Sequence, residues 1–155
     1  MVRLKIICFV TAGLLLGLAQ IEAGEELDFK EVLPQASQFM PVKKGAEVFY
    51  YKAQDQDGKL IGAVFKAEGK SYSAIETLVG MLSDGTIVAI KVLSQNETPG
   101  IGSRITEPQF TDQFRNIKDI SKVQAITGAT VSSQVVIDAV RKKAEAIKEL
   151  LKDEA

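Results

Sequence analysis

The sequence predicts a single α+β domain in which an antiparallel sheet carries peripheral helices and a long C-terminal helix. Two pairs of β-prone segments, each joined by a turn that contains Asp and Gly, predict antiparallel hairpins. A last segment with apolar residues at spacings of three and four predicts an amphipathic helix. The 155 residues suffice for one ordinary core, and no repeat or linker divides them.

The chain begins with two basic residues and an uncharged apolar run over residues 6–19. A membrane span needs about 20 apolar residues, whereas the core of an export signal needs about 7–15. Residues 1–23 are therefore expected to be a signal peptide cleaved near Ala23, with an uncleaved, tilted membrane anchor as the alternative. Both interpretations place residues 24–155 outside the cytoplasm, in the periplasm or on the outer face of the cytoplasmic membrane.

Residues 27–33 have the pattern of a short amphipathic helix, which should end near Pro34 because proline lacks the backbone N–H that a helix interior requires. Residues 47–53 and 60–66 are β-prone and flank the turn signal of residues 55–58. These two segments are expected to pair as a hairpin.

Residues 72–82 and 86–93 repeat the hairpin pattern around Asp84-Gly85. Phe110 and Phe114 then stand at positions i and i+4, so a short helix would place both rings on one face. The final helix is expected over about residues 132–152. Its apolar positions are Val136, Val140, Ala144, Ile147 and Leu151.

The composition excludes several kinds of chemistry. There is no His, and the single Cys, Cys8, lies in the apolar N-terminal run. Disulfides within the domain, Cys/His zinc sites and nucleophilic catalysis by Cys or His are therefore excluded. A net charge of −1 without a basic cluster gives no indication of nucleic-acid binding. Redox activity would need an organic cofactor or an oxygen-ligated metal, and no catalytic or metal-binding residue is predicted.

A phosphate-binding motif is indicated directly before the last helix, at Thr127, Gly128, Ala129 and Thr130. The first N–H groups of a helix have no intrahelical partner and lie at the positive end of its dipole, where anions bind. Gly128 allows close backbone approach, while Ser132 and Ser133 can cap the helix or bond a phosphate oxygen. An ordinary strand–turn–helix junction is the alternative interpretation.

A second motif is the loop Glu97-Thr98-Pro99-Gly100-Ile101-Gly102. Pro99 fixes one φ angle, and Gly100 and Gly102 permit positive φ. The loop can therefore hold backbone N–H and C=O groups toward a planar ring with hydrogen-bonding edges, although a surface turn would have a similar composition.

Taken together, the two motifs resemble the FMN-binding domain shared by the G subunit of the Rnf electron-transport complex and the C subunit of the sodium-pumping NADH:quinone reductase. The resemblance spans about residues 58–139 and implies that Thr130 is esterified to the phosphate of FMN. It also implies that Glu97 and Thr98 lie near the flavin ring. Ser71 and Tyr72 match a segment that carries an aromatic near the flavin, with packing in the core as the other interpretation of Tyr72.

The resemblance implies an exported electron-transfer flavoprotein, either a component of a Rnf-type complex or a free-standing relative. Its partners would be a flavin transferase for maturation and membrane redox-complex subunits or another electron carrier. One position departs from the family, because the transferase prefers Asp where this chain has Gln124. The change keeps hydrogen-bonding capacity and removes a negative charge. A carrier or sensor that binds FMN non-covalently therefore stays an alternative, as does a structural domain without cofactor.

Overall fold

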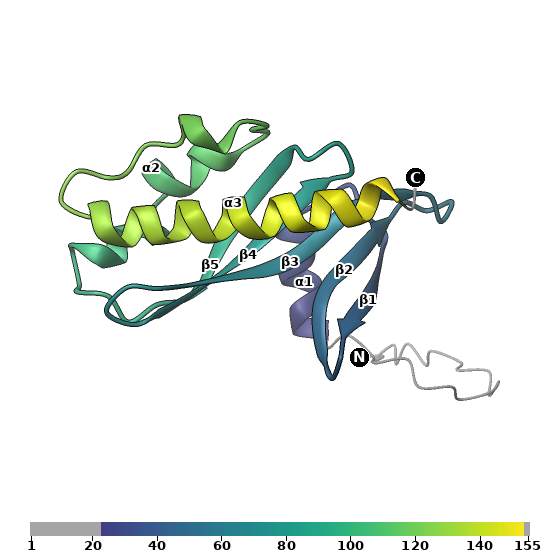
Figure 1. The fold of residues 1–155 in the computed structure, drawn as a ribbon, viewed down its shortest axis with the longest axis horizontal. Helices are drawn as coiled ribbons and strands as arrows, with labels where there is room; N and C mark the ends of the chain where they lie inside the picture. The colour runs from purple at the N-terminus through teal and green to yellow at the C-terminus, as the bar shows by residue number, and fades with distance from the viewer. Residues whose placement is uncertain (1–22, 154–155) are drawn as a thin grey trace, which may run out of the picture.

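The computed structural model describes residues 23–153 and contains one five-stranded antiparallel sheet in the order β1-β2-β3-β4-β5 (Figure 1). Each strand pairs with the next along the chain, so the sheet is a meander. The strands are β1 (Gln38–Lys44), β2 (Glu47–Gln54), β3 (Leu60–Lys70), β4 (Ala74–Leu82) and β5 (Ile87–Ser94). The predicted α+β class and both predicted hairpins are confirmed.

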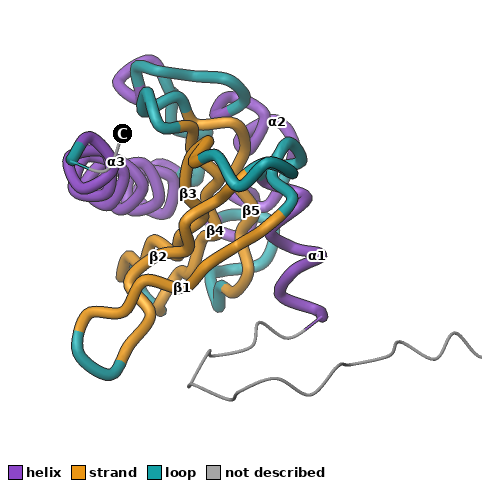
Figure 2. The backbone as a smooth tube through the Cα atoms, turned by 90° about the vertical axis from the view of Figure 1, so that its right-hand side faces the viewer, coloured by secondary structure: helices purple, strands orange, loops and turns teal. Residues whose placement is uncertain are grey.

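Helices cover both faces of the sheet. Helix α1 (Ala23–Val32) packs against β4 and β5, while the long helix α3 (Thr130–Lys152) crosses the opposite face against β3 (Figure 2). Between β5 and α3 the chain forms short helical turns. These are η1 (Gly102–Thr106), α2 (Pro108–Thr111), η2 (Asp112–Phe114) and η3 (Ile120–Lys122).

Two apolar clusters form the core, one on each face of the sheet. The cluster under α3 includes Phe65, Phe110 and Phe114, and the cluster under α1 includes Phe29 and Leu33. The rings of Phe110 and Phe114 meet edge to face with centroids 5.5 Å apart, as their i, i+4 spacing predicts. Burying one such side chain contributes about 1.5–3 kcal/mol, so the two clusters fix α1 and α3 on the sheet.

The structure differs from the sequence-based expectation at β1 and at the start of α3. The sequence does not predict β1, because this strand contains Pro41 and ends in Lys43-Lys44. It lies at the edge of the sheet, where a missing proline N–H costs little and charged side chains stay in water. Helix α3 begins at Thr130 rather than Ser132, because Gly128 at a φ of 84° turns the chain into the helix early.

The predicted export segment lies outside the described residues, apart from Ala23 at its end, which begins α1. Within residues 23–153, the helices are too short or too polar to cross a membrane.

Candidate functional site

Three segments that are distant in the sequence meet at the N-terminal end of α3. These are the turn before α3, the loop of residues 97–102 and the turn of residues 71–73 between β3 and β4, which lies at the same end of the molecule (Figure 1). They enclose a pocket of about 280 Å³. The pocket is lined by Tyr72, Glu97, Thr98, Ile101, Gly102, Gly128, Ala129, Thr130, Val131 and Ser132. The structure therefore brings together most of the site residues that the two motifs predict.

The N-terminus of α3 is open to an anion. Ala129 is the residue before the helix, and no side chain caps the first turn. Thr130 is the first helical residue and is exposed, and it belongs to the first turn, whose N–H groups have no intrahelical partner. Gly128 has a φ of 84°, and a Cβ placed on it would meet nothing within 4 Å. A phosphate can therefore approach this turn closely.

Thr127 and Ser133 stabilise the turn rather than line the pocket. The carbonyl of Thr127 accepts a 3.0 Å hydrogen bond from Nη1 of Arg104, a residue that neither sequence motif includes. Ser133 is fully buried, and its Oγ donates to the Ala129 carbonyl at 2.7 Å and accepts from the Ile126 N–H at 3.1 Å. These bonds set the direction in which the chain enters α3.

Glu97 is the electrostatic centre of the site. The residue is only 6% exposed, and its carboxylate accepts hydrogen bonds from Ser132 Oγ at 2.6 Å, from Ser71 Oγ at 3.1 Å and from Ser73 Oγ at 3.1 Å. The Ser132 bond, helped by those of Ser71 and Ser73, holds the pKa of Glu97 below its usual range against the opposing effect of burial. The ionised carboxylate thereby joins all three segments of the site.

The two glycines of the loop serve different purposes. Gly100 has a φ of 71° and donates its N–H to Ser103 Oγ at 2.9 Å, which closes the turn outside the pocket. Gly102 is not at positive φ, but a Cβ on it would lie 2.7 Å from Ser132 Oγ and 2.8 Å from Glu97 Cβ. Gly102 is therefore required because the loop approaches α3 closely.

Exposed apolar side chains surround the pocket. Tyr72 is 86% exposed, Val131 is 60% exposed and Ile101 is 54% exposed, and each comes from a different segment. The interpretation of Tyr72 as a core residue is therefore wrong. Ile101 and Val131 were not predicted as site residues, although Val131 lies outside the buried stripe of α3, which is a signal that could have identified it.

Gln124, which stands where the resemblance leads us to expect Asp, lies just upstream of the turn. Its backbone N–H donates to Gln113 Oε1 at 2.8 Å, and its carbonyl accepts from Gln113 Nε2 at 3.2 Å. Gln124 itself is exposed. Gln113 thus holds the backbone of Gln124 in place, while the exposed Gln124 side chain is free to contact another protein.

Comparison with known proteins identifies the family of this chain. The family model described as an FMN-binding domain matches residues 71–145. The chain is 39% identical to the G subunit of the ion-translocating oxidoreductase complex of Methanosarcina acetivorans, covering 80% of this chain and 74% of that protein. It is 36% identical to the G subunit of the proton-translocating ferredoxin:NAD(+) oxidoreductase complex of Clostridium ljungdahlii, covering 63% and 59%.

Two solved structures have the same fold. NqrC of Shewanella oneidensis superposes with a TM-score of 0.51 at 22% identity, covering 84% of this chain and 78% of that one. The C subunit of the Na(+)-translocating NADH-quinone reductase of Parabacteroides distasonis superposes with a TM-score of 0.56 at 18% identity, covering 84% and 85%.

Proposed function

This chain belongs to the FMN-binding domain family, and we propose that it is an electron-transfer flavoprotein that carries FMN at the N-terminal end of α3. Its side chains include no His, and its single Cys precedes the domain, so electrons would pass through the flavin. The protein would supply the position and the electrostatic surroundings of the cofactor.

The observation that carries this proposal is the uncapped start of α3 with the exposed Thr130 beside the pocket. The first-turn N–H groups and the helix dipole favour a phosphate there, by roughly 0.3–1 kcal/mol and up to ~2 kcal/mol when partly buried. The Thr130 hydroxyl would form the phosphate ester with FMN that a flavin transferase presents in activated form. Its oxygen would displace the activating group from the phosphorus, and its proton would pass to a base of the transferase. Gly128 would let the phosphate reach the backbone.

The ring system would lie over the pocket between the loop of residues 97–102 and α3. When bound, the isoalloxazine supplies the redox chemistry. Tyr72, Ile101 and Val131 offer apolar contact to a flat ring and exclude water from it. The carboxylate of Glu97 accepts hydrogen bonds from three serine hydroxyls, so Glu97 would position the walls of the site.

Export and partners form part of the same proposal. The chain would be cleaved near Ala23, or anchored by residues 1–23, and residues 24–155 would act outside the cytoplasm. Its relatives are named as subunits of ion-translocating and proton-translocating oxidoreductase complexes. The partners would accordingly be subunits of a membrane redox complex of the Rnf type, or another electron carrier if the protein is free-standing.

Gln124 favours a second candidate, a carrier or sensor that binds FMN non-covalently. A transferase that reads a negative charge at this exposed position would modify the chain slowly or not at all. The pocket and the open start of α3 would then still bind FMN reversibly.

The test uses the full chain produced with a flavin transferase and run on a denaturing gel. Flavin fluorescence should persist in wild type and in Thr127→Val, which alters a threonine of the same motif outside the pocket. It should disappear in Thr130→Val, which keeps the shape of the side chain and removes the oxygen. Fluorescence in Thr130→Val equal to that of wild type would contradict the attachment point.

A further inference from the structure

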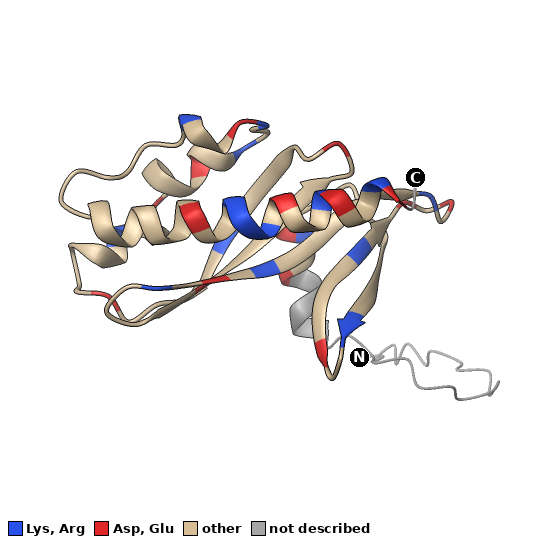
Figure 3. Cartoon of the chain, in the orientation of Figure 1, with Lys and Arg blue, Asp and Glu red and all other residues tan. Residues whose placement is uncertain are grey.

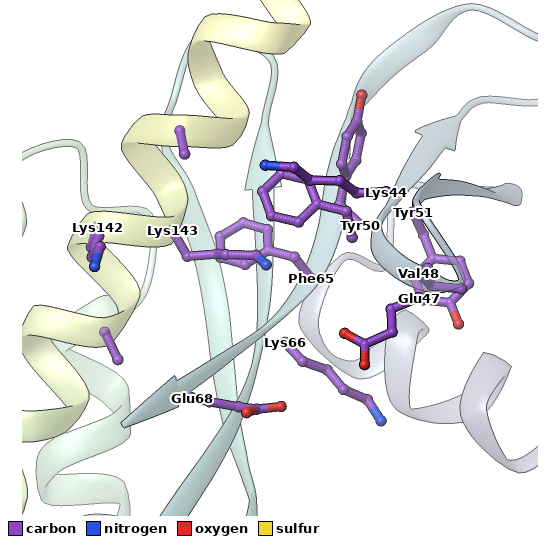
Figure 4. Close-up of a pocket in the computed structure, with 13 residues that line it drawn as sticks. Lys44, Glu47, Val48, Tyr50, Tyr51, Phe65, Lys66, Glu68, Lys142 and Lys143 are labelled. Atoms are coloured by element: carbon purple, nitrogen blue, oxygen red, sulfur yellow. The ribbon is translucent and has the colours of Figure 1, made fainter. Parts of the chain in front are cut away.

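A groove of about 590 Å³ lies between the second half of α3 and the end of the β1–β2 hairpin (Figure 4). It shares no lining residue with the proposed flavin pocket. Its first α3 residue, Ala139, lies nine residues beyond Thr130, about 14 Å along the helix at 1.5 Å per residue. The groove is therefore a second, separate cavity.

Apolar side chains form much of the groove wall. Ala139 and Ala146 of α3 have small side chains that leave space between the helix and the sheet. Opposite them lie the half-buried Phe49 of β2 and the buried Phe65 of β3. A volume of this size, with aromatic walls and a few convergent charged groups, falls in the range of about 300–1,000 Å³ that is usual for small-molecule sites.

Two ammonium groups of the groove contact the same aromatic ring. Nζ of Lys143 lies 3.7 Å from the centroid of the Phe49 ring, and Nζ of Lys44 lies 5.5 Å from the same centroid. Figure 4 shows Lys143 reaching from α3 and Lys44 from the end of β1 toward the middle of the groove. Among the side chains that the structure describes, those of residues 28–153, no carboxylate lies within 4 Å of either ammonium, and the Phe49 ring is a contact of both.

The surroundings of Lys143 disfavour its own charge. Burial lowers the pKa of Lys143, the like charge of Lys44 lowers it further, and Glu68 opposes both effects. Basic and acidic residues alternate along α3 and the neighbouring strands (Figure 3). Lys66 pairs with Glu76, and the other three lysines that line the groove still outnumber its two glutamates. An anion bound beside Lys143 and Lys44 would offset the repulsion between their like charges.

We propose that this groove binds a small organic anion, whose aromatic body packs against Phe49 and whose anionic group pairs with Lys143 and Lys44. An inorganic anion would leave the apolar walls in water, because it has no surface to cover them. A neutral aromatic would displace water from both ammonium groups without compensating their charge. The combination of ring and charge therefore defines the class of ligand.

The test is a titration of the full chain with 8-anilinonaphthalene-1-sulfonate, an aromatic sulfonate, followed by backbone amide NMR shifts. We expect saturable 1:1 binding with shifts at Phe49 and over residues 139–146. Lys143→Gln should raise the Kd at least about tenfold, the effect of losing one charge-assisted contact. Lys148→Gln is the matched control, since Lys148 lies on the same helix and lines a different cavity, and its Kd should equal that of wild type.

A second lysine variant and a competition experiment distinguish this groove from other binding sites. Lys44→Gln alters an exposed side chain and should weaken binding even if Lys143→Gln fails to fold. Any of three results would overturn the proposal. These are equal Kd values for the lysine variants and the control, NMR shifts centred on Thr130, and full displacement of the sulfonate by an equal concentration of inorganic phosphate. Protein with and without FMN should give the same Kd, so this result does not depend on the proposed function.

Discussion

The hydroxyl of Ser132 donates a 2.6 Å hydrogen bond to Oε2 of Glu97, and both residues are almost completely buried. The bond joins the first turn of α3 to the glycine-containing loop. Because Ser71 and Ser73 bind the same carboxylate, the turn between β3 and β4 is held as well. One carboxylate thus determines how the three walls of the proposed flavin pocket are placed.

Replacement of Glu97 by Gln should weaken the site and the fold together. The amide keeps the shape but loses the charge, and its NH₂ group cannot accept the bonds that the serine hydroxyls donate. We expect the free energy of unfolding without flavin to fall by about 1.5–3 kcal/mol, the contribution of a hydrogen bond to a charged group. Glu107→Gln removes an exposed carboxylate 3.6 Å from Arg104 and should cost less than about 1 kcal/mol in urea denaturation. Equal losses in both variants would show that Glu97 has no special role.

The stabilising effect of Glu97 should depend on pH. Its pKa in the folded protein lies below the ordinary value of 4.5, so the contribution is complete above that pH and is lost as the pH falls through the folded pKa. The difference in unfolding free energy between wild type and Glu97→Gln should therefore be constant near neutral pH and shrink below about pH 4. Urea denaturation at a series of pH values measures this difference. A gap that stays constant into acid would mean that the carboxylate is not the stabilising group.

Tyr72→Ser should separate ligand binding from stability. Since the side chain is 86% exposed, its removal should change the free energy of unfolding by no more than about 0.5 kcal/mol. Flavin affinity of the non-covalent complex should nevertheless fall, because a ring contact is lost. Flavin fluorescence titration and thermal unfolding of the same samples measure the two effects. A large loss of unfolding free energy with unchanged flavin affinity would show that Tyr72 stabilises the fold and does not contact the flavin.

Gln124→Asp should increase the rate of covalent flavin attachment if the transferase reads a negative charge at this position. The backbone there is held by Gln113, so the substitution adds charge without moving the motif. Gln35→Asp makes the same change at an exposed position elsewhere and serves as the control. The fraction of flavin-carrying protein over time is the readout. Equal rates in Gln124→Asp, Gln35→Asp and wild type would show that the transferase does not recognise a charge at residue 124.

The hairpins and the last helix could be predicted because local periodicity determines them. The turn residues Asp84-Gly85 and the apolar stripe of α3 are visible within short segments. Strand β1 could not be predicted in this way, because Pro41 and the terminal lysines conceal a strand that forms by pairing with β2. Propensity was overridden there by tertiary pairing.

The candidate site was predicted as motifs but not as a network. The sequence marks Thr130 and the glycine-containing loop, since those residue types match a phosphate and a flat ring. It does not show that Glu97 binds Ser71 and Ser132, because these residues come together only when β3, β4 and α3 pack. The second groove was missed for the same reason: Phe49 and Lys143 belong to elements that are far apart in the chain.

The ester between FMN and Thr130 is tested by the intact mass of the chain produced with a flavin transferase, followed by fragmentation. We expect a mass increase of one FMN less one water, located on the fragment that contains Thr130 and absent from Thr130→Val. A chain that carries its covalent flavin on any other residue, or that never acquires covalent flavin under these conditions, would contradict it.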